Sequence, residues 1–436
     1  MERRPATAVH LLCFDRRVAN ARTVVMTDSV HRLSADALQL LSLWGAYPGM
    51  ELTPPAIASL VGRPRQQVRA PLHELVQAQL VITRAHDRYL VREPLPDSVQ
   101  VLTEGVPEPE RRAALRRLLD HYLYTAHRAE GLLLQRHYER LTLPPPASAV
   151  IVGEFADQRR ALTWFTAELP VLLTAVTRAF EAGLDTHAWQ LTTILATFLN
   201  RQGRWNEFLA CQTVALRAAQ RAGDRTGQAR LHLETALSLT QLGRHDEAYT
   251  HLHTALDLFD TLGDGLGQAR VHLHLGWLYD CQRRYPEALV HDQQALELFE
   301  THGVKIGQAT ALNAVGWDLI HLGRAEEGID PCRRALDLFR ELGDLSGEAR
   351  AWDSVGYARY HLGHYSRAIA CYEQALAIYQ RLKDRYCEAE TLIHLGDVRY
   401  ADGRHQAAQH AWRRALAILE HLGHSDVEQV RSRLSR

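Results

Sequence analysis

The chain's 24 histidines are the first residues to consider for chemistry, because imidazole is a common metal ligand and general base. Two histidines on one helix share a metal ion when they are three or four residues apart, since that spacing puts them on one face. His251 with His253 and His272 with His274 are spaced by two, so the side chains of each pair diverge on a helix. The sequence therefore predicts no metal site.

Motifs for nucleotide binding and covalent catalysis are also absent from the sequence. Gly-x-Ser-x-Gly, His-Glu-x-x-His and Gly-x-Gly-x-x-Gly do not occur. The only lysines, Lys305 and Lys383, do not follow a glycine, which excludes a Walker A phosphate loop. Paired carboxylates such as Glu326 and Glu327 fall at a predicted exposed turn, where nothing would bury them and shift a pKa. We predict a protein that is not an enzyme and needs no cofactor.

Composition limits the class of protein and its surroundings. At 436 residues the chain can hold two or three domains, and its formal charge of -1 is not that of a protein built as a whole to neutralise phosphate. The six cysteines form no Cys-x-x-Cys pair, which favours reduced thiols in a cytoplasm. No signal peptide and no membrane-spanning apolar run are found. The expected location is cytoplasmic.

The last half of the chain repeats a pattern of small residues every 40 positions. A glycine column holds Gly223, Gly263, Gly303, Gly343 and Gly423, with Lys383 as its one exception, and an alanine column holds Ala229, Ala269, Ala309, Ala349 and Ala389. Apolar residues recur at helical spacing, so each unit is predicted to be a helical hairpin that packs against its neighbours. Gly263 would end one helix in the left-handed conformation, and Asp264 would cap the next.

This pattern resembles the tetratricopeptide repeat in a 40-residue form. The marks of that repeat are Leu275-Gly276, Tyr279, Ala288 and Ala295, and a similar set returns around Leu395-Gly396. We expect degenerate first hairpins at residues 159–228, the regular repeats at 229–423 and a capping helix at 424–436.

The resemblance implies a concave binding face, lined by the first helix of each unit. Counting one, four and eight residues from the alanine column gives the predicted peptide- or partner-binding residues, which are Arg230, Arg270, Trp277, Asn313, Trp317, Arg350, Asp353 and Tyr357. The aromatic faces and arginines suit a protein or peptide, and the arginines favour an acidic segment, with Glu390 and Asp397 setting polarity at the far end. The alternative is that the aromatic rings pack between repeats and the arginines are solvated.

Upstream of the repeats, residues 33–105 have the pattern of a winged helix. Three helices are expected, through Leu38–Leu43, from Thr53 to Val61 and from Arg63 to Gln77, followed by a hairpin of Leu80–Thr83 and Arg88–Val91. DNA binding would use Arg63, Arg65 and Arg69 on the third helix and Arg84 and Arg88 on the wing. The alternative is a docking or spacer domain, because Pro71 would bend the third helix and Glu74 dilutes its charge.

The predicted fold class is therefore mainly α, an α-solenoid of tetratricopeptide repeats with a small N-terminal winged-helix domain. Residues 106–158 are predicted to be a helical linker, with a long helix from Glu110 and a proline-rich break at Leu143-Pro144-Pro145-Pro146. Residues 1–32 are a residual N-terminal segment with one short helix, Ala8 to Asn20.

The order of these segments resembles the C-terminal half of actinobacterial STAND regulators with an NB-ARC domain, of the Streptomyces antibiotic regulatory protein type. The resemblance rests on Glu110–Leu115, His121–Leu123, Phe155–Asp157 and Ala161–Phe165, placed between the winged helix and the repeats. It implies that the repeats are a sensing or partner-binding arm. The nucleotide-binding domain is missing, and Val91-Arg92-Glu93 replaces the family's Phe-His-Asp type motif, so nucleotide switching is not expected.

Three functions remain open from the sequence. The first is a non-enzymatic regulatory or adaptor protein that binds a protein or peptide in the groove of its repeats. The second is a transcriptional regulator that binds DNA through the winged helix and senses an effector through the repeats. The third is an enzyme or enzyme accessory, which no sequence motif supports.

Overall fold

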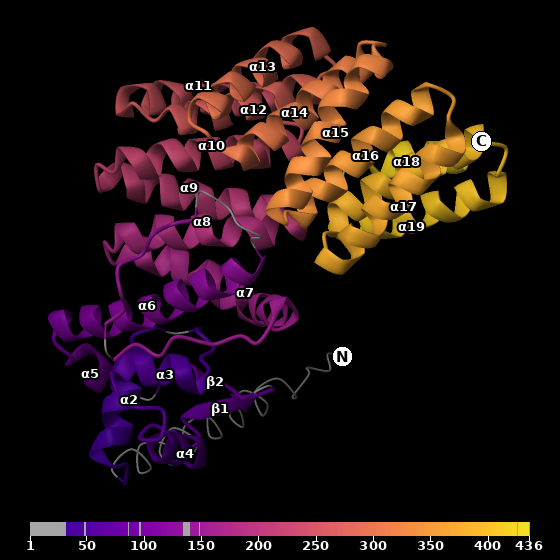
Figure 1. Cartoon of the computed structure of the whole chain (residues 1–436). Helices are drawn as coiled ribbons and strands as arrows, with labels where there is room; N and C mark the ends of the chain where they lie inside the picture. The colour runs from indigo at the N-terminus through magenta and orange to yellow at the C-terminus, as the bar shows by residue number, and fades with distance from the viewer. Residues whose placement is uncertain are drawn as a thin grey trace, which may run out of the picture. The chain divides into compact units, whose positions relative to one another are not determined.

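The computed structural model describes residues 32–47, 49–85, 87–95, 97–133, 140–147, 149–424 and 426–435. Helices make up most of these residues, and the only strands among them are two short ones (Figure 1). The chain divides into two compact units. The first contains residues up to Arg128 with Leu143–Phe155 and Thr166–His187, and the second contains Ala129–Thr142, Ala156–Phe165 and Ala188–Arg436. The helix expected from Ala8 to Asn20 lies outside the described residues.

Three helices and a hairpin follow one another at the start of the first unit. They are α2 (Ala35–Gly45), α3 (Pro54–Val61), α4 (Arg69–Gln77), β1 (Val81–Arg84) and β2 (Arg88–Val91). Ser34 caps α2 by accepting a backbone hydrogen bond, and Gly62 ends α3 in the left-handed conformation. The strands pair antiparallel with Val81 opposite Val91. Helix α2 packs against α3, α4 and β2, and its Trp44 is fully buried.

Helix α4 begins later than the sequence indicated. Residues 65–68 form turns, so Arg63 and Arg65 lie before α4 and only Arg69 lies in it. Pro71 is the third residue of α4, where backbone N–H groups have no acceptor within the helix. The proline therefore removes no helical hydrogen bond, and the expected bend is wrong. A helix that began at Arg63 would have held Pro71 in its interior at a cost of about 3 kcal/mol, which explains the later start.

Three longer or connecting helices follow the hairpin. They are α5 (Asp97–Glu104), α6 (Glu108–Leu133) and α7 (Gln158–Glu181). The buried face of α6 carries Leu118, Leu119 and Tyr122, as its amphipathic pattern indicated. Between α6 and α7, residues 140–147 and 149–157 form no regular secondary structure, because a run of three prolines supplies no N–H groups for a helix.

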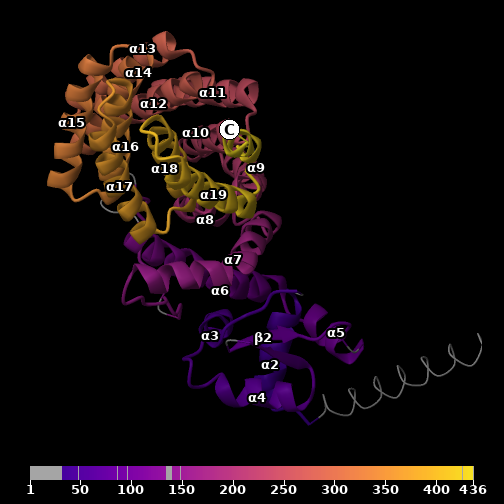
Figure 2. The ribbon, with the colours of Figure 1, turned by 90° about the vertical axis from the view of Figure 1, so that its right-hand side faces the viewer.

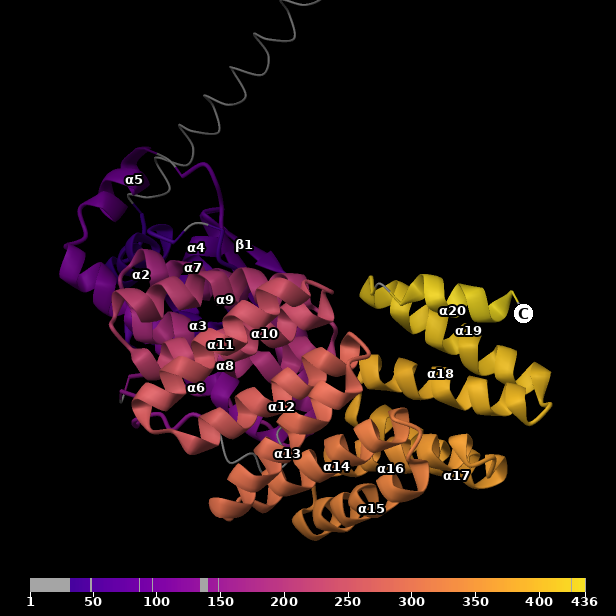
Figure 3. The ribbon, with the colours of Figure 1, turned by 90° about the horizontal axis from the view of Figure 1, so that it is seen from above.

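The second unit is an array of six helical hairpins and a final helix. The first helices of the hairpins are α8 (Asp185–Arg201), α10 (Arg225–Gln241), α12 (Gly265–Cys281), α14 (Lys305–His321), α16 (Leu345–His361) and α18 (Arg385–Ala401). The second helices are α9 (Trp205–Arg221), α11 (His245–Leu262), α13 (Tyr285–Thr301), α15 (Ala325–Leu342), α17 (Tyr365–Leu382) and α19 (His405–Leu422), and α20 (Val427–Leu434) closes the chain. Seen from above, α10, α12, α14, α16 and α18 follow one another in succession (Figure 3).

Turn chemistry sets the period of the array. Gly263 and Gly343 end their helices in the left-handed conformation, and the side chains of Asp264 and Asp344 accept hydrogen bonds from the next helix's first turn. Lys383 adopts the same conformation with a φ of 58°, in the place where the other units have glycine. The predicted caps of the outer turns are therefore confirmed.

Close helix contacts account for the columns of small residues. A Cβ atom on Gly276 would lie 2.2 Å from Asp292 Oδ1, and one on Gly396 would lie 2.2 Å from Trp412 Nε1. Real Cβ contacts do not reach such distances, so only glycine admits the packed second helix. Three more glycines make similarly close contacts in the first turns of α12, α14 and α16. Each faces a buried phenylalanine of the preceding helix, and they are Gly267, Gly307 and Gly347.

The array closes on itself within the second unit. The ring of Trp205 at the start of α9 lies 5.1 Å from the ring of Tyr386 in α18 and 5.1 Å from that of His424 before α20. The side chain of Leu422 lies beside Gly203. In Figure 2 the helices α10, α12, α14, α16 and α18 lie on the inside of this array, and α11, α13, α15 and α17 lie on its outside.

Candidate binding face

The inner face of the array is formed by the helices α10, α12, α14, α16 and α18 (Figure 2). These helices carry the residues that follow the alanine column by one, four and eight positions, and also those that follow by eleven and twelve. The second pair of positions includes Asp280, His321 and His361, which the sequence prediction did not select.

Trp317 is the centre of the inner face. Its indole Nε1 donates a hydrogen bond to Asp280 Oδ1 at 3.1 Å, which links α14 to α12. Its ring lies 4.8 Å from the ring of Tyr357 in α16 and 4.7 Å from that of His321. Both Trp317 and Tyr357 are half-buried, so each ring packs on its neighbours and still reaches solvent. Two of the three predicted aromatic residues are therefore together.

The third predicted aromatic residue, Trp277, is placed differently. Its ring contact is with His274 of its own helix, at 6.4 Å between ring centroids. Burial lowers the pKa of His274 to about 3, and Arg270 lowers it further, so this imidazole is neutral at physiological pH. The Trp277 side chain is also half-buried on α12.

Polar side chains next to the rings have oxygen atoms without a partner. Asp353 Oδ1 lies 2.8 Å from Nδ1 of His394 in α18, whereas Asp353 Oδ2 is enclosed and has no hydrogen-bond partner in the described chain. Asn313 Oδ1 is likewise enclosed and unpartnered among the described residues. Leaving an enclosed acceptor unsatisfied costs about 1–3 kcal/mol.

The predicted arginines lie on the same first helices and have contacts of their own. Arg230 and Arg270 are half-buried, and both interact with other residues of the chain. Arg350 is exposed, with its guanidinium 6.0 Å from the ring of Phe339. The three arginines therefore lie in α10, α12 and α16, among the first helices of the hairpins.

Acidic groups of the inner face lie in a desolvated environment. Burial raises the pKa of Asp280 to about 6, although the hydrogen bond from Trp317 lowers it, and burial raises that of Glu390 to about 7. For His394, burial opposes protonation, but Asp353 and Glu390 raise its pKa overall. The signal that could have revealed Asp280 and His394 was their position in the repeat, eleven and five residues after the alanine column.

The five arginines expected to meet DNA are mostly engaged in ion pairs. Arg88 is 9% exposed, and its guanidinium donates to both carboxylate oxygens of Glu168, at 2.7 and 3.2 Å. The others with acidic partners are Arg63 with Asp36 at 2.8 Å, Arg84 with Glu51 at 3.8 Å and Arg65 with Asp87 at 4.0 Å. The expectation that Arg88 is an exposed wing residue is therefore wrong, because Glu168 of α7 buries it.

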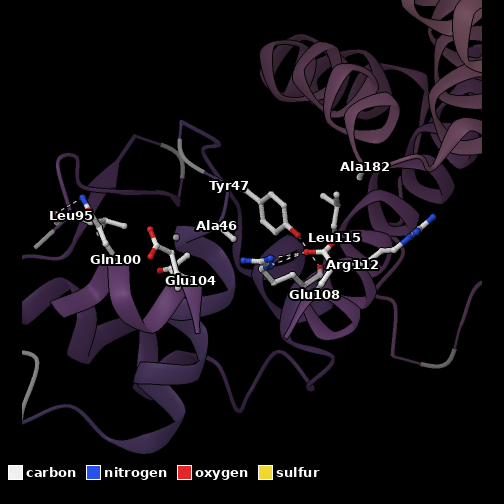
Figure 4. A pocket seen from close by; sticks show the side chains of 12 residues that line it. Ala46, Tyr47, Leu95, Gln100, Glu104, Glu108, Arg112, Leu115 and Ala182 are labelled. Carbon is white, nitrogen blue, oxygen red and sulfur yellow. Dashed lines mark hydrogen bonds and ion pairs between the residues drawn. The ribbon is translucent and has the colours of Figure 1, made fainter. Parts of the chain in front are cut away.

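A pocket of about 420 Å³ lies in the first unit, lined by the end of α2, by α5 and by the first turns of α6 (Figure 4). The hydroxyl of Tyr47 donates to the backbone oxygen of Arg111 at 2.8 Å, and Arg111 pairs with Glu108 at 2.7 Å. Burial raises the pKa of Tyr47 to about 12. The lining contains no histidine, cysteine or serine.

Histidines pair across helices rather than along them. The Nδ1 atoms of His232 and His251 lie 2.9 Å apart, and those of His272 and His291 lie 3.0 Å apart in the next repeat. Burial lowers the pKa of His232 and of His272 to about 4, which suits a hydrogen bond between two neutral rings. In the part of the chain that the structure describes, no group of three or more His, Cys, Asp or Glu side chains is arranged to hold a metal ion.

Two features of the described residues concern the cysteines and membranes. Cys211, Cys281, Cys332, Cys371 and Cys387 are all free thiols. No helix in the described ranges combines the length and the apolar character needed to cross a bilayer.

Comparison with known proteins identifies the repeats. The tetratricopeptide repeat family matches residues 228–301, 307–381 and 347–421. No curated protein matches the sequence. Among solved structures, BtubC from P. vanneervenii is similar, with 23% identity over 49% of this chain and 91% of that chain and a TM-score of 0.40.

Two further solved structures are similar to this chain. A Rap protein complexed with competence and sporulation factor has 14% identity over 59% of this chain and 78% of that one, with a TM-score of 0.45. A STAND protein with a tetratricopeptide repeat sensor from Pyrococcus horikoshii has 14% identity over 93% of this chain and 64% of that one, with a TM-score of 0.42. The matched segments between residues 228 and 421 of this chain are tetratricopeptide repeats.

Proposed function

We propose that this protein is a non-enzymatic regulator or adaptor that binds a protein or peptide on the inner face of its repeats. The observation that carries the proposal is the Trp317–Tyr357 ring pair beside the unpartnered oxygens of Asn313 and Asp353. Aromatic rings supply contact area at low entropic cost, and the oxygens can accept hydrogen bonds from the N–H groups of a peptide. The site would hold an extended segment.

The charge of the first helices favours an acidic partner, and the segment before the array would have a separate role. Arg230, Arg270 and Arg350 lie on successive or nearby first helices and would attract a carboxylate-bearing part of the partner. We place the protein in the cytoplasm, in agreement with its free thiols. Residues 33–105 would form a winged-helix domain that acts as a docking or dimerising head.

DNA binding by this head has less support than docking. A cation that is already paired with a carboxylate must lose that partner before it can neutralise phosphate. Arg63 and Arg88 are both paired at 2.8 Å or less, and Arg88 is also buried. Two of the five arginines selected for DNA binding are therefore already neutralised, and phosphate neutralisation is the main source of affinity for DNA.

Affinity capture from the native host tests the proposal. Wild-type protein, Trp317→Ala and Arg270→Ala would be compared with Tyr249→Ala and Arg334→Ala, whose side chains are exposed on the outer helices α11 and α15. The first two variants should lose the captured partner while unfolding within a few degrees of the wild type. The two outer variants should retain it. Equal capture by all five proteins would contradict the proposal.

A further inference from the structure

We propose that the middle of the inner face, around Asp280, Trp317 and Tyr357, binds a positively charged side chain of the partner, an arginine or a lysine. This inference rests on the proposed function and adds the chemistry of one contact. The repeat pattern does not by itself create this site. Trp317 and Tyr357 follow the alanine column by eight residues, whereas Asp280 follows it by eleven.

The aromatic half of this site is fixed in orientation. The hydrogen bond from Trp317 Nε1 to Asp280 holds the indole, and the ring of Tyr357 packs against it with an interplanar angle of 32°. The faces of tryptophan and tyrosine attract cations because their π-systems are negative. Within the described chain, Arg284 lies over Tyr279 and Arg340 over Trp352, whereas no arginine or lysine lies over Trp317 or Tyr357. The imidazole of His394 lies 6.1 Å from the Trp317 ring and 5.5 Å from the Tyr357 ring, but both rings are only half-buried and can meet a cation from outside.

Asp280, the acidic group bonded to Trp317, has no cationic partner within the described chain. Asp397, further along the face, is neutralised by Arg433 of α20 through contacts of 2.8, 3.1 and 3.2 Å. In contrast, no described lysine, arginine or histidine forms an ion pair with Asp280, whose polar contact is with Trp317. Glu390 accepts a hydrogen bond from the Tyr386 hydroxyl and interacts with His394, which lowers its pKa. Desolvated carboxylates without a cation are costly, and a bound cation would stabilise their charged forms.

The remaining titratable groups around the rings do not repel a cation at neutral pH. Burial, with His361 and His394 nearby, lowers the pKa of His321 to about 4, so its imidazole is neutral. Burial also lowers the pKa of His361. His394 is the exception, since its pKa is raised, but its charge is held by Asp353 at 2.8 Å. Asp280 and Asp397 are the carboxylates that act on Tyr357, and because Arg433 pairs with Asp397, Asp280 is the acidic group left to attract a cation.

The inference predicts a preference between simple charged peptides. The probes are fluorescein-labelled hexa-arginine, hexa-lysine and hexa-glutamate, and binding is followed by fluorescence anisotropy at 150 mM salt, where exposed charges are largely screened. Hexa-arginine should bind the wild-type protein, with hexa-lysine weaker because arginine stacks better on aromatic rings.

Three carboxylate variants locate the bound cation. Asp280→Asn and Glu390→Gln keep the size of each side chain and should each weaken hexa-arginine binding by about tenfold or more. Asp337→Asn, an exposed carboxylate on the outer helix α15, is the matched control and should leave binding within about twofold. Melting temperatures confirm that the variants are folded. Equal effects of Asp280→Asn and Asp337→Asn, no binding of hexa-arginine, or tighter binding of hexa-glutamate would each overturn the inference.

Failure of this inference is distinguishable from failure of the proposed function. If hexa-arginine does not bind but Trp317→Ala still loses the partner captured from the host, the inner face binds a partner of other chemistry. If Trp317→Ala retains the captured partner, the proposed function itself is contradicted.

Discussion

Arg88 and Glu168, 80 residues apart in the sequence, form a buried ion pair in the first unit, with two hydrogen bonds between the guanidinium and the carboxylate. Their side chains are 10% and 4% exposed. Burial raises the pKa of Glu168, while Arg88 lowers it. The pair ties strand β2 to helix α7, so Arg88 serves the fold rather than a ligand.

Removal of either partner of this pair should destabilise the first unit. Arg88→Ala would leave a buried carboxylate without its cation, and such losses cost about 3–5 kcal/mol. Urea denaturation followed by circular dichroism measures the change. Arg84→Ala, which removes an exposed arginine 3.8 Å from Glu51, is the control and should cost less than about 1 kcal/mol. A similar loss in both variants would show that the buried pair has no special role.

Gly356 and Gly396 occupy the same position of the repeat, but alanine should affect stability differently at each. In Gly396→Ala the new Cβ would lie 2.2 Å from Nε1 of Trp412, which is fully packed, so the variant should lose about 1–3 kcal/mol. In Gly356→Ala the nearest atom, on Tyr372, would be 3.0 Å away. A gain of up to about 1 kcal/mol in helix propensity would offset the smaller clash there. Urea denaturation compares the two, and equal stability would contradict the packing account.

The outer turns and the columns of small residues followed directly from the sequence, because they depend on local chemistry. A glycine that ends a helix, and an aspartate that accepts a hydrogen bond from the N–H group three residues later, can be predicted without knowing which distant residues pack against them. Arg283 and Lys383 are the exceptions, since both adopt a positive φ without being glycine.

Contacts between residues at different positions of the repeat could not be predicted from the columns of small residues. Trp317 bonds to Asp280, 37 residues away, so the contact joins different positions of two adjacent repeats. The closure of Trp205 on Tyr386 depends on how much each hairpin turns relative to the last, and small rotations summed over the array decide it. The pairing of Arg88 with Glu168, 80 residues away, is likewise a long-range contact that no local sequence pattern indicates.

Closure of the array should respond to Trp205. Trp205→Ala removes the ring, 4% exposed, that contacts Tyr386 and His424, and it should cost about 3–5 kcal/mol. Hydrogen exchange should show faster amide exchange in α18 and α20 as well as in α9. Trp189→Ala removes a similarly buried ring that packs beside α9 and α10, and should spare α18 and α20. If both variants give the same exchange pattern, the closing contact contributes little.

The buried carboxyls Asp292 and Asp318 should make stability depend on pH. Burial raises the pKa of Asp318 from 3.8 to about 8, with a further contribution from Asp280, and burial together with Asp318 raises the pKa of Asp292. The folded protein therefore holds protons that the unfolded chain releases. This stability is fully present below pH 3.8 and is lost as the pH rises towards 8.

The measurement is the free energy of unfolding between pH 7.5 and 8.5, where His321, whose pKa is lowered to about 4, is neutral in the folded chain and ordinary histidines are largely neutral in the unfolded chain. Asp318→Asn should reduce the slope by up to about 1.4 kcal/mol per pH unit, since one proton no longer dissociates. Glu326→Gln at an exposed turn is the control. An unchanged slope in Asp318→Asn would show that the pair does not hold a proton in the folded protein.

The most direct test of partner binding on the inner face is site-specific photo-crosslinking in the native host. A benzoylphenylalanine placed at Thr310, a half-buried inner position of α14, is compared with one at Val290, which is 52% exposed on the outer helix α13. The inner probe should form a crosslink to a distinct protein or peptide, which mass spectrometry identifies, and Trp317→Ala should abolish it. Crosslinking of that partner from Val290 and not from Thr310 would contradict the account.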